Sequence, residues 1–346
     1  MVKVLVVDDS VFMRTVIRDM LSRDPSFEVV GTASDGLDAL EKIKTLEPDI
    51  VTLDIEMPKM NGLEVLKELR LAKRRPKILM LSSLTSKGAE MTTEAIRLGA
   101  DDFMLKPTDL PRVREIGDEL AVKIRHLLTL TRPALTHNLP ARTGVADRVV
   151  IIGSSAGGPP MLDTLLSQLP ADLPAGIVVT QHMPVGFTAP LAERFKRIAA
   201  MPVKETENGD LIETGKILLS KAGVHTVISG VIEPDGKKAG RIIHSNAPPL
   251  HGVRPAVDKT FESAAHVYGK NVVAVVLSGM GNDAGEGAAA IKQAGGVSLI
   301  CDEKDCLVYG MARSAITKNA VDSILPLKKL AKEIELAVRR MDGGHV

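Results

Sequence analysis

The sequence contains few aromatic residues. Its 346 residues include six Phe, two Tyr and no Trp, which together make up 2% of the chain. The core is therefore expected to consist of Val, Ile, Leu, Ala and Met, a composition that suits layered α/β packing. Proteins that bind single-stranded nucleic acid stack the bases on aromatic side chains, so this scarcity argues against that class.

The chain also lacks an excess of charge of one sign. Its 44 Lys and Arg residues are balanced by 43 Asp and Glu, which gives a formal net charge of +1. Proteins bind nucleic acid by neutralising phosphates with basic side chains. We therefore expect no nucleic-acid partner, and a transcriptional regulator is disfavoured for the same reason.

Cysteine and long apolar segments are scarce as well. Cys301 and Cys306 are the two cysteines, too few for a disulfide framework or a zinc site built from two cysteine pairs, so we interpret both as reduced. No stretch approaches the roughly 18 consecutive apolar residues of a membrane span, and the first residues, MVKVLVVDDS, lack the features of a secretory signal. These absences predict a cytoplasmic protein without membrane insertion.

The apolar pattern that is present divides the chain into two α/β regions. Residues 1–128 alternate amphipathic helices with short apolar runs at 4–7, 29–32, 50–53, 78–81 and 103–105, which predicts a parallel sheet covered on both faces. The segment 129–147 holds two Pro and no apolar periodicity and is predicted to be a linker.

A second region, residues 148–346, repeats the alternation of strands and helices. Strands are predicted at 149–152, 177–180, 217–219, 242–244, 272–277, 297–301 and 323–325. We expect a doubly wound, mostly parallel α/β domain here.

Polar residues follow the predicted strands of the first region at the points where the apolar runs stop. These residues are Asp8, Asp9, Asp54, Ser82 and Lys106. The carboxyl ends of parallel strands meet at one edge of the sheet, where ligands bind. Three carboxylates there would repel one another unless a cation lay among them, and Mg²⁺ prefers such oxygen ligands. Helix capping explains single residues such as Ser10 and Asp35 but not the whole set.

The pieces VVDDS, LDIEMPKMNG, LSS and LKP make this region similar, over its whole length, to the receiver domain of bacterial response regulators. The resemblance implies a flavodoxin-like fold and a histidine kinase as phosphodonor. It implies these roles: Asp54 as phosphoacceptor; Asp8, Asp9, Asp54 and the backbone carbonyl of Glu56 as Mg²⁺ ligands; and Ser82, Phe103 and Lys106 as switch residues. Phe103 stands where many receivers carry Tyr, and the resemblance also implies a cis bond between Lys106 and Pro107.

The second region begins with a strand followed by Gly153-Ser154-Ser155-Ala156-Gly157, which fits the G-x-S-x-G pattern of a nucleophile elbow. Glycines allow a tight turn from strand to helix, and the helix N-terminus offers free N–H groups to a developing oxyanion. The same glycines could also cradle a phosphate. The loop by itself leaves a hydrolase and a nucleotide-binding module open.

Two further strand ends favour the hydrolase. His182 follows the predicted strand at 177–180, and Asp283 lies in a glycine-rich turn after the strand at 272–277. Ser155, His182 and Asp283 can therefore meet at one edge of the sheet as nucleophile, general base and orienting acid. Each residue alone has a structural explanation, but the triad explains all three.

The blocks IGSSAGG, TQHMP, HGVRPAVDKTFESAA and LSGMGNDAGEG resemble, in order and spacing, the catalytic domain of the chemotaxis protein-glutamate methylesterases, the CheB family. The chain order Ser, His, Asp differs from that of α/β-hydrolases. The resemblance places the oxyanion contacts at the backbone amides of Ala156 and Met280. Three positions depart from the family pattern, none of them in the triad: Ala156, Ala256 and Ala312.

The resemblance implies a phosphorylation-regulated carboxylic ester hydrolase. It would remove methyl groups, as methanol, from glutamates on the cytoplasmic helical region of chemoreceptors, and also deamidate receptor glutamines. We expect a monomer whose catalytic domain needs no cofactor. The alternative is a receiver that controls a nucleotide-binding or other non-hydrolytic output module.

Overall fold

The computed structural model describes residues 1–346 apart from 71, 73–74, 107–112, 130–143, 233–237 and 342–346. The chain forms two compact units, Met1–Arg132 and Pro133–Val346, which are described separately below. Most of the predicted linker at 129–147, and Pro107 with its expected cis bond, lie outside the described residues. The domain boundaries 1–128, 129–147 and 148–346 therefore stay predictions.

The first unit is a parallel sheet of five strands in the order β2-β1-β3-β4-β5. The strands are β1 (Val2–Val7), β2 (Phe27–Ala33), β3 (Ile50–Asp54), β4 (Lys77–Ser82) and β5 (Asp102–Leu105). The helices are α1 (Val11–Leu21), α2 (Gly36–Leu46), α3 (Gly62–Leu69), α4 (Ser86–Leu98) and α5 (Val113–Thr129). The order confirms the flavodoxin-like prediction.

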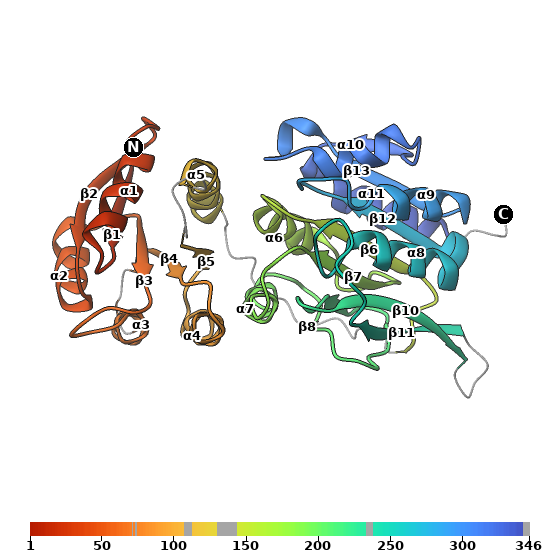
Figure 1. The fold of residues 1–346 in the computed structure, drawn as a ribbon, viewed down its shortest axis with the longest axis horizontal. Helices are drawn as coiled ribbons and strands as arrows, with labels where there is room; N and C mark the ends of the chain where they lie inside the picture. Colours follow the sequence, from red (N-terminus) through yellow and green to blue (C-terminus); the bar gives the residue numbers. More distant parts are fainter. Residues whose placement is uncertain (71, 73–74, 107–112, 130–143, 233–237, 342–346) are drawn as a thin grey trace. The chain divides into compact units, whose positions relative to one another are not determined.

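Helices cover both faces of this sheet. Figure 1 shows α1 and α5 on one face and α2, α3 and α4 on the other. Both faces of the interior strand β1 are therefore buried, which explains why Val4–Val7 are all apolar and fully buried. Ser10 and Asp35 cap the N-termini of α1 and α2 by accepting hydrogen bonds from backbone N–H groups, as predicted.

The second unit contains a parallel sheet of seven strands in the order β14-β13-β12-β6-β7-β9-β8. Its strands are β6 (Val149–Ser154), β7 (Gly176–Gln181), β8 (Val203–Glu205), β9 (Ile217–Leu219), β12 (Val272–Val276), β13 (Val297–Cys301) and β14 (Ser323–Leu325). The helices are α6 (Gly158–Gln168), α7 (Thr188–Phe195), α8 (Val257–Tyr268), α9 (Gly285–Gln293), α10 (Gly310–Thr317) and α11 (Leu327–Arg340), with short 3₁₀ turns η1 (Gly269–Asn271) and η2 (Glu303–Asp305).

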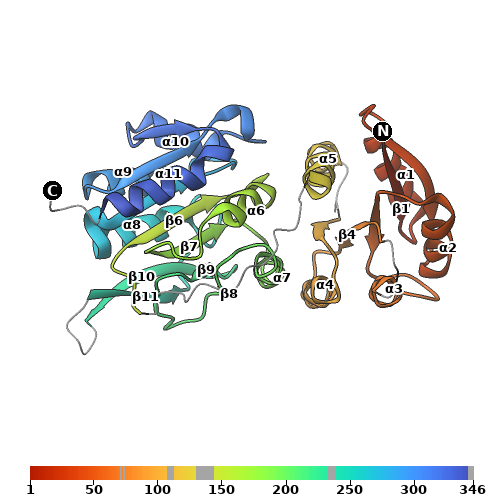
Figure 2. The ribbon, with the colours of Figure 1, turned by 180° about the vertical axis from the view of Figure 1, so that it is seen from behind.

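This sheet is also covered on both faces. Helix α6 packs against α7 and α11, whereas α8, α9 and α10 pack together on the opposite face (Figures 1 and 2). The core on the α8 side is aliphatic apart from Phe261, Tyr268 and Tyr309. The doubly wound prediction is confirmed for this unit.

One pair of strands lies outside the parallel sheet. Strands β10 (His225–Ile232) and β11 (Lys238–Ser245) form an antiparallel hairpin that packs against α8. The sequence predicted a strand at 242–244 but missed β10, because its sequence HTVISGVI mixes polar and apolar residues and is only half buried. The short edge strand β8 was missed for lack of a sustained apolar run.

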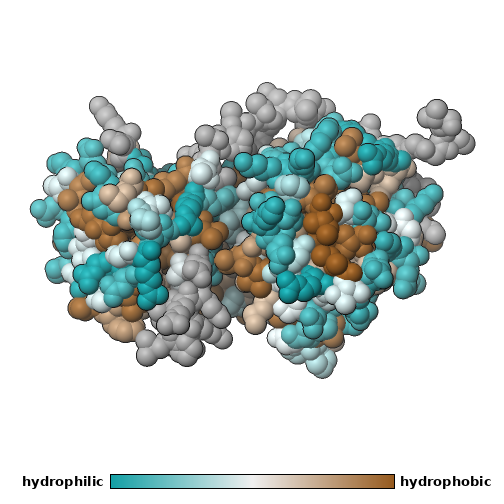
Figure 3. Space-filling view, turned by 90° about the horizontal axis from the view of Figure 1, so that it is seen from above, coloured by the Kyte–Doolittle hydropathy of each residue, from teal (hydrophilic) through white to brown (hydrophobic). Residues whose placement is uncertain are grey.

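The visible surface of both units is largely hydrophilic, with separate apolar areas (Figure 3). Among the described residues, the large apolar side chains with the greatest exposure include Ile232 at 74% and Met280 at 73%. Within the described residues, no helix combines the length and apolarity needed to cross a bilayer.

Candidate functional site

The carboxyl edge of the first sheet gathers three carboxylates around one ammonium group. Lys106 Nζ lies 2.8 Å from Asp8 Oδ2 and 2.7 Å from Asp54 Oδ2. Asp9 joins them, because one carboxylate oxygen from each of the three acids lies within 4.8 Å of the others. A cavity of about 240 Å³ opens beside this group and is lined in part by Asp9, Asp54, Glu56 and Lys106.

Burial and the neighbouring opposite charge act in opposite directions on the pKa values of Asp54 and Lys106. Burial raises the pKa of Asp54 from 3.8 to about 6, although the hydrogen bond with Lys106 works in the opposite direction and the charge of Asp8 adds to the rise. Burial acts to lower the pKa of Lys106, but its contacts with Asp54 and Asp8 outweigh that effect and raise it. The single ammonium therefore does not fully compensate the buried carboxylates.

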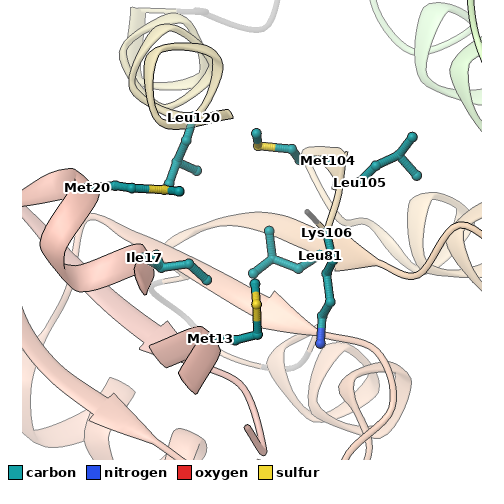
Figure 4. A pocket seen from close by; sticks show the side chains of 8 residues that line it. All are labelled: Met13, Ile17, Met20, Leu81, Met104, Leu105, Lys106 and Leu120. Atoms are coloured by element: carbon teal, nitrogen blue, oxygen red, sulfur yellow. The ribbon is translucent and has the colours of Figure 1, made fainter. Parts of the chain in front are cut away.

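Lys106 reaches this edge along an apolar wall. Its aliphatic stem lines a small cavity with Met13, Leu81 and Met104, and its nitrogen points away from these apolar side chains (Figure 4). The stem is thereby packed between α1, β4 and β5 while the charge stays at the sheet edge. Packing of this kind limits the positions that the ammonium can take.

The expected switch residues lie on β4, which neighbours the strand of Asp54, and on β5, which follows β4 in the sheet. Ser82, at the end of β4, donates a hydrogen bond to the carbonyl of Gly88 at 3.1 Å and accepts one from Thr92 Oγ1 at 2.8 Å. Phe103 on β5 is only 3% exposed, and Lys123 Nζ lies 5.9 Å from its ring centroid. The aromatic ring is therefore packed inward in this conformation.

The donor set at this edge fits a hard divalent cation. Three carboxylates with oxygens within 4.8 Å supply anionic ligands, and Asp8 Oδ2 is buried with no hydrogen bond beyond its charge contact with Lys106 among the described residues. The side chain of Glu56 is engaged by Lys87 at 2.8 Å, and the receiver resemblance implies that its backbone carbonyl is a further ligand. Oxygen ligands of this kind suit Mg²⁺.

In the second unit, Ser155 follows β6 at the turn into α6. Its backbone N–H donates to the carbonyl of Ser278 at 2.8 Å, which ties the turn to the end of the neighbouring strand β12. Gly157 has a φ of +75° and so permits the tight reversal that a residue with Cβ would resist. Gly279 packs on Ser155, since a Cβ at Gly279 would lie 3.0 Å from Ser155 Cβ.

His182 and Asp283 lie at the ends of the strands on either side of β6. Strands β12, β6 and β7 are neighbours in the sheet, so the three predicted residues share one edge. His182 Nε2 is 2.8 Å from Asp283 Oδ2. A carboxylate can only accept, so His182 donates from Nε2 and Nδ1 remains the free ring nitrogen. This arrangement is the reverse of the chymotrypsin-type triad, in which Nδ1 faces the aspartate.

Asp283 accepts hydrogen bonds from backbone N–H groups as well as from His182. Its carboxylate also accepts backbone hydrogen bonds from Val257 at 2.6 Å, Asp258 at 2.8 Å and Ala284 at 3.0 Å. Burial opposes ionisation of Asp283, but the bonds from His182 and from the α8 N-terminus outweigh it and lower the pKa of Asp283. The acid therefore remains an anion able to stabilise a charged His182.

The backbone amides of Ala156 and Met280 are the expected oxyanion contacts. Both residues are exposed, and neither N–H makes a hydrogen bond within the described part of the chain. The amide of Gly158 donates to the carbonyl of Ser155 at 2.9 Å instead. Pro159 and Pro160 at the start of α6 also carry no N–H, so the first turn of this helix offers few donors to a phosphate, which disfavours the nucleotide-binding alternative.

Sequence reasoning missed the residues that support this turn. Gln181 and Ser278 are almost fully buried at the ends of β7 and β12, and each makes hydrogen bonds to a backbone carbonyl of the Ser155 turn. They stand inside the quoted blocks TQHMP and LSGMGNDAGEG, next to a triad residue in one case. Gln181 directly precedes His182, and Ser278 begins the glycine-rich turn that leads to Asp283. These positions in the sequence were the available indication.

A second histidine–aspartate pair adjoins the triad and was also missed. His251 Nε2 is 2.9 Å from Asp258 Oδ2, and Asp258 follows Val257 at the start of α8. Burial raises the pKa of Asp258 to about 6, with the amide of Gly287 and the nearby charges of Asp283 and His251 as smaller influences. The α8 N-terminus thus holds two carboxylates of opposite titration behaviour.

Comparison with known proteins gives the same division of the chain. The family profile described as CheB methylesterase matches residues 150–334, and that of the response regulator receiver domain matches residues 4–117. A protein-glutamate methylesterase/protein-glutamine glutaminase 1 from Methanospirillum hungatei is 55% identical over 344 residues, covering 99% of this chain and 100% of that protein. A protein-glutamate methylesterase/protein-glutamine glutaminase from Thermotoga maritima is 40% identical over 96% of this chain and 97% of its own length.

A solved structure agrees with the catalytic unit. The crystal structure of the Thermotoga maritima CheB methylesterase catalytic domain is 36% identical and aligns with a TM-score of 0.52, covering 56% of this chain and 99% of that one. These matches confirm the resemblance and support the hydrolase over a nucleotide-binding output. The chain therefore belongs to the CheB methylesterase family and carries a response regulator receiver domain at its N-terminus.

Proposed function

We propose that this protein is a phosphorylation-regulated hydrolase that removes methyl groups from glutamate methyl esters on the cytoplasmic helices of chemoreceptors. The observation that carries the proposal is the position of Ser155, His182 and Asp283 at the ends of three adjacent strands, with the His182–Asp283 hydrogen bond formed. The protein would act in the cytoplasm, as a monomer, without a cofactor in its catalytic domain.

The reaction begins with transfer of a proton to His182. His182 Nδ1 removes the proton of Ser155 Oγ as that oxygen attacks the ester carbonyl carbon. The tetrahedral oxyanion accepts hydrogen bonds from the N–H groups of Ala156 and Met280. Asp283, with its lowered pKa, stabilises the imidazolium that forms.

The tetrahedral intermediate then collapses. The protonated His182 gives its proton to the departing methoxide, which leaves as methanol, and the glutamyl group stays on Ser155 as an ester. A water molecule loses a proton to His182, attacks that ester and releases glutamate, and His182 returns the proton to Ser155. With a glutamine side chain the leaving group is ammonia, so the same steps produce deamidation.

Regulation is assigned to the receiver. A histidine kinase would supply the phosphoryl group to Asp54, with Ser82 and Lys106 beside it and Phe103 as a buried switch residue. Mg²⁺, held by Asp8, Asp9, Asp54 and the carbonyl of Glu56, would neutralise phosphoryl charge in this cavity. The family resemblance implies that the unphosphorylated receiver inhibits the catalytic domain.

The hydrolase is tested by methanol release from methylated receptor membranes. We expect Ser155→Ala to abolish release, whereas Ser167→Ala on α6, a serine that donates only to a carbonyl of its own helix, keeps the wild-type rate. A serine-directed fluorophosphonate should label Ser155 in the wild type. Release that persists in Ser155→Ala would refute the assignment.

The regulation is tested in the same assay. A small-molecule phosphodonor with Mg²⁺ should raise the wild-type rate and leave Asp54→Asn unchanged. Removal of residues 1–146 should raise basal activity. A truncated protein no faster than the unphosphorylated full chain would contradict the inhibitory role.

A further inference from the structure

Gln181 is not a member of the triad, yet its side chain contacts both the turn of Ser155 and the turn of His182. The side chain is 2% exposed and lies at the end of β7, directly before His182. Its Nε2 donates to the carbonyl of Ser155 at 2.9 Å and to the carbonyl of His182 at 2.9 Å. Its Oε1 accepts from Ser154 Oγ at 2.5 Å.

These contacts fix the orientation of the Gln181 amide. Both Nε2 hydrogens are directed at carbonyl oxygens, and Oε1 accepts the hydroxyl proton of Ser154. The reversed amide would place its oxygen against two carbonyls, which is repulsive. Gly158 leaves the space that this side chain occupies, because a Cβ there would lie 2.3 Å from Gln181 Oε1.

Anchoring the carbonyl of Ser155 determines where the next N–H points. A trans peptide is planar, and its C=O and N–H point in opposite directions. The carbonyl of Ser155 accepts from Gln181 and from the amide of Gly158, so the N–H of Ala156 is turned away from the interior. That N–H has no partner among the described residues, as an oxyanion donor requires.

The second oxyanion amide has the same kind of anchor. The carbonyl of Gly279 accepts from the N–H of Met311 at 3.0 Å, so the peptide between Gly279 and Met280 is fixed with the N–H of Met280 on the opposite side. In both peptides the carbonyl end is held and the N–H end is free. For Met280 the anchor is backbone, whereas for Ala156 it includes a side chain that can be changed.

We infer that Gln181 is a positioning residue that aims the backbone N–H of Ala156 at the oxyanion and joins the turn of Ser155 to the turn of His182. The inference rests on the proposed hydrolase function and adds a residue outside the triad. Its effect should fall on kcat, because an oxyanion contact forms only in the transition state. KM should change little.

The test compares Gln181→Met with a matched control. Met keeps the size of the side chain and removes its three hydrogen bonds. Thr180→Val changes the preceding residue of β7, which is fully buried and whose hydroxyl lies 3.0 Å from Ser220 Oγ and 3.1 Å from Thr260 Oγ1. Successive strand residues face opposite sides of a sheet, so the control removes buried hydrogen bonds away from the catalytic turns.

We expect Gln181→Met to lower kcat by about 10- to 100-fold, less than or similar to the loss of a whole oxyanion donor. KM should stay within about twofold. The rate of Ser155 labelling by a fluorophosphonate, which forms a tetrahedral adduct, should fall in parallel. Thr180→Val should keep both rates within about twofold even if its thermal stability falls equally.

Two results would overturn the inference: wild-type kcat and labelling in Gln181→Met, or an equal loss of both in Thr180→Val. Labelling of wild-type Ser155 without methanol release would refute the proposed ester substrate. The labelling rates of the two variants would still decide the role of Gln181. Absence of labelling in the wild type would overturn both proposals.

Discussion

The two sheet edges use the same residue type in opposite ways. At the receiver edge, Asp54 lies close to the carboxylates of Asp8 and Asp9, and burial raises its pKa to about 6. At the catalytic edge, Asp283 is just as buried, but His182 and three backbone N–H groups donate to it, and its pKa is lowered. Burial alone therefore does not determine how a strand-end aspartate titrates; the donors around it do.

The difference matches the two proposed tasks. Asp283 must remain an anion throughout a catalytic cycle, so it is saturated with donors. Asp54 must keep an oxygen available for a phosphoryl group, and among the described residues its one side-chain donor is Lys106, whose Nζ lies 2.7 Å from Asp54 Oδ2. A carboxylate that is incompletely compensated is more nucleophilic and gains more from an added cation.

The largest expected effect is on catalysis at the saturated aspartate. Asp283→Asn would present an N–H₂ group to His182 Nε2 and force the opposite tautomer, so that Nδ1 could no longer accept the proton of Ser155. We expect kcat to fall by about 10⁴-fold in the methanol assay. Asp322→Asn, which alters a carboxylate bonded to the amide of Ser298 in the same unit, should stay near wild type. A decrease in kcat of less than tenfold in Asp283→Asn would contradict the proposed role of Asp283 in catalysis.

The next effect is on the stability of the receiver. Lys106→Met would leave Asp8 and Asp54 buried without their ammonium partner. We expect the free energy of unfolding of the receiver at pH 7 to fall by about 3 kcal/mol, measured by hydrogen exchange of the β1 and β3 amides. Mg²⁺ should restore more stability to this variant than to the wild type.

The control for that experiment is Lys87→Met, which removes an exposed ion pair with Glu56. Exposed pairs contribute little, so this variant should behave as the wild type. Equal responses of the two lysine variants to Mg²⁺ would show that Lys106 does not compensate the carboxylates.

A smaller effect concerns the sign of the pH dependence. The folded-state pKa of Asp54, about 6, lies above its ordinary 3.8, so the wild type loses stability as pH rises from about 4 to 6. Without Mg²⁺, Asp54→Asn should therefore be about 3 kcal/mol more stable than the wild type at pH 7 and lose that advantage near pH 4.

Asp283→Asn should show the reverse. The lowered pKa of Asp283 contributes stability above its ordinary value, and that contribution is lost as pH falls through the folded-state pKa. The variant should be less stable than the wild type at pH 7, with the gap closing in acid. Hydrogen exchange of β12 amides measures it, and shifts of the same sign at pH 7 in both aspartate variants would contradict the contrast.

The smallest expected effect is at Ser82. Its buried hydroxyl bonds to Gly88 and Thr92, so Ser82→Ala should destabilise the receiver by about 1 kcal/mol and weaken the response to a phosphodonor. Ser22→Ala removes an exposed hydroxyl that donates to the carbonyl of Arg18 at the end of α1 and should change neither quantity. Identical behaviour of the two serine variants would remove Ser82 from the switch.

Much of the architecture was predictable because buried parallel strands appear in the sequence as uninterrupted apolar runs. All five receiver strands were predicted, and the strand predicted at 323–325 coincides with β14, Ser323–Leu325. Strand β10 was not predicted, since its first residues are mostly buried and its last mostly exposed, so that no sustained apolar run marks it, and it pairs with β11 outside the main sheet. Glycine and apolar spacing cannot tell a parallel from an antiparallel partner.

The sequence predicted which residues form the candidate site, but not which of their atoms contact one another. Strand-end positions in the sequence pointed to Ser155, His182 and Asp283. They did not indicate that His182 uses Nε2 toward Asp283, because that depends on the approach of the α8 N-terminus. Gln181 was not predicted for a similar reason: two of its three contacts are with backbone carbonyls, which any sequence offers, and the third is with the hydroxyl of Ser154, which only the fold brings to it.

Residue order by itself determined two aliphatic α/β sheets, an acidic cluster with a lysine, and a Ser-His-Asp set, because burial and strand ends are properties of local sequence. Tertiary structure alone decided the ionisation of each aspartate and the direction of each oxyanion amide. Both depend on donors brought from other elements, Lys106 for Asp54 and the first amides of α8 for Asp283. Electrostatic energies vary with distances of a few ångströms, which only the folded chain sets.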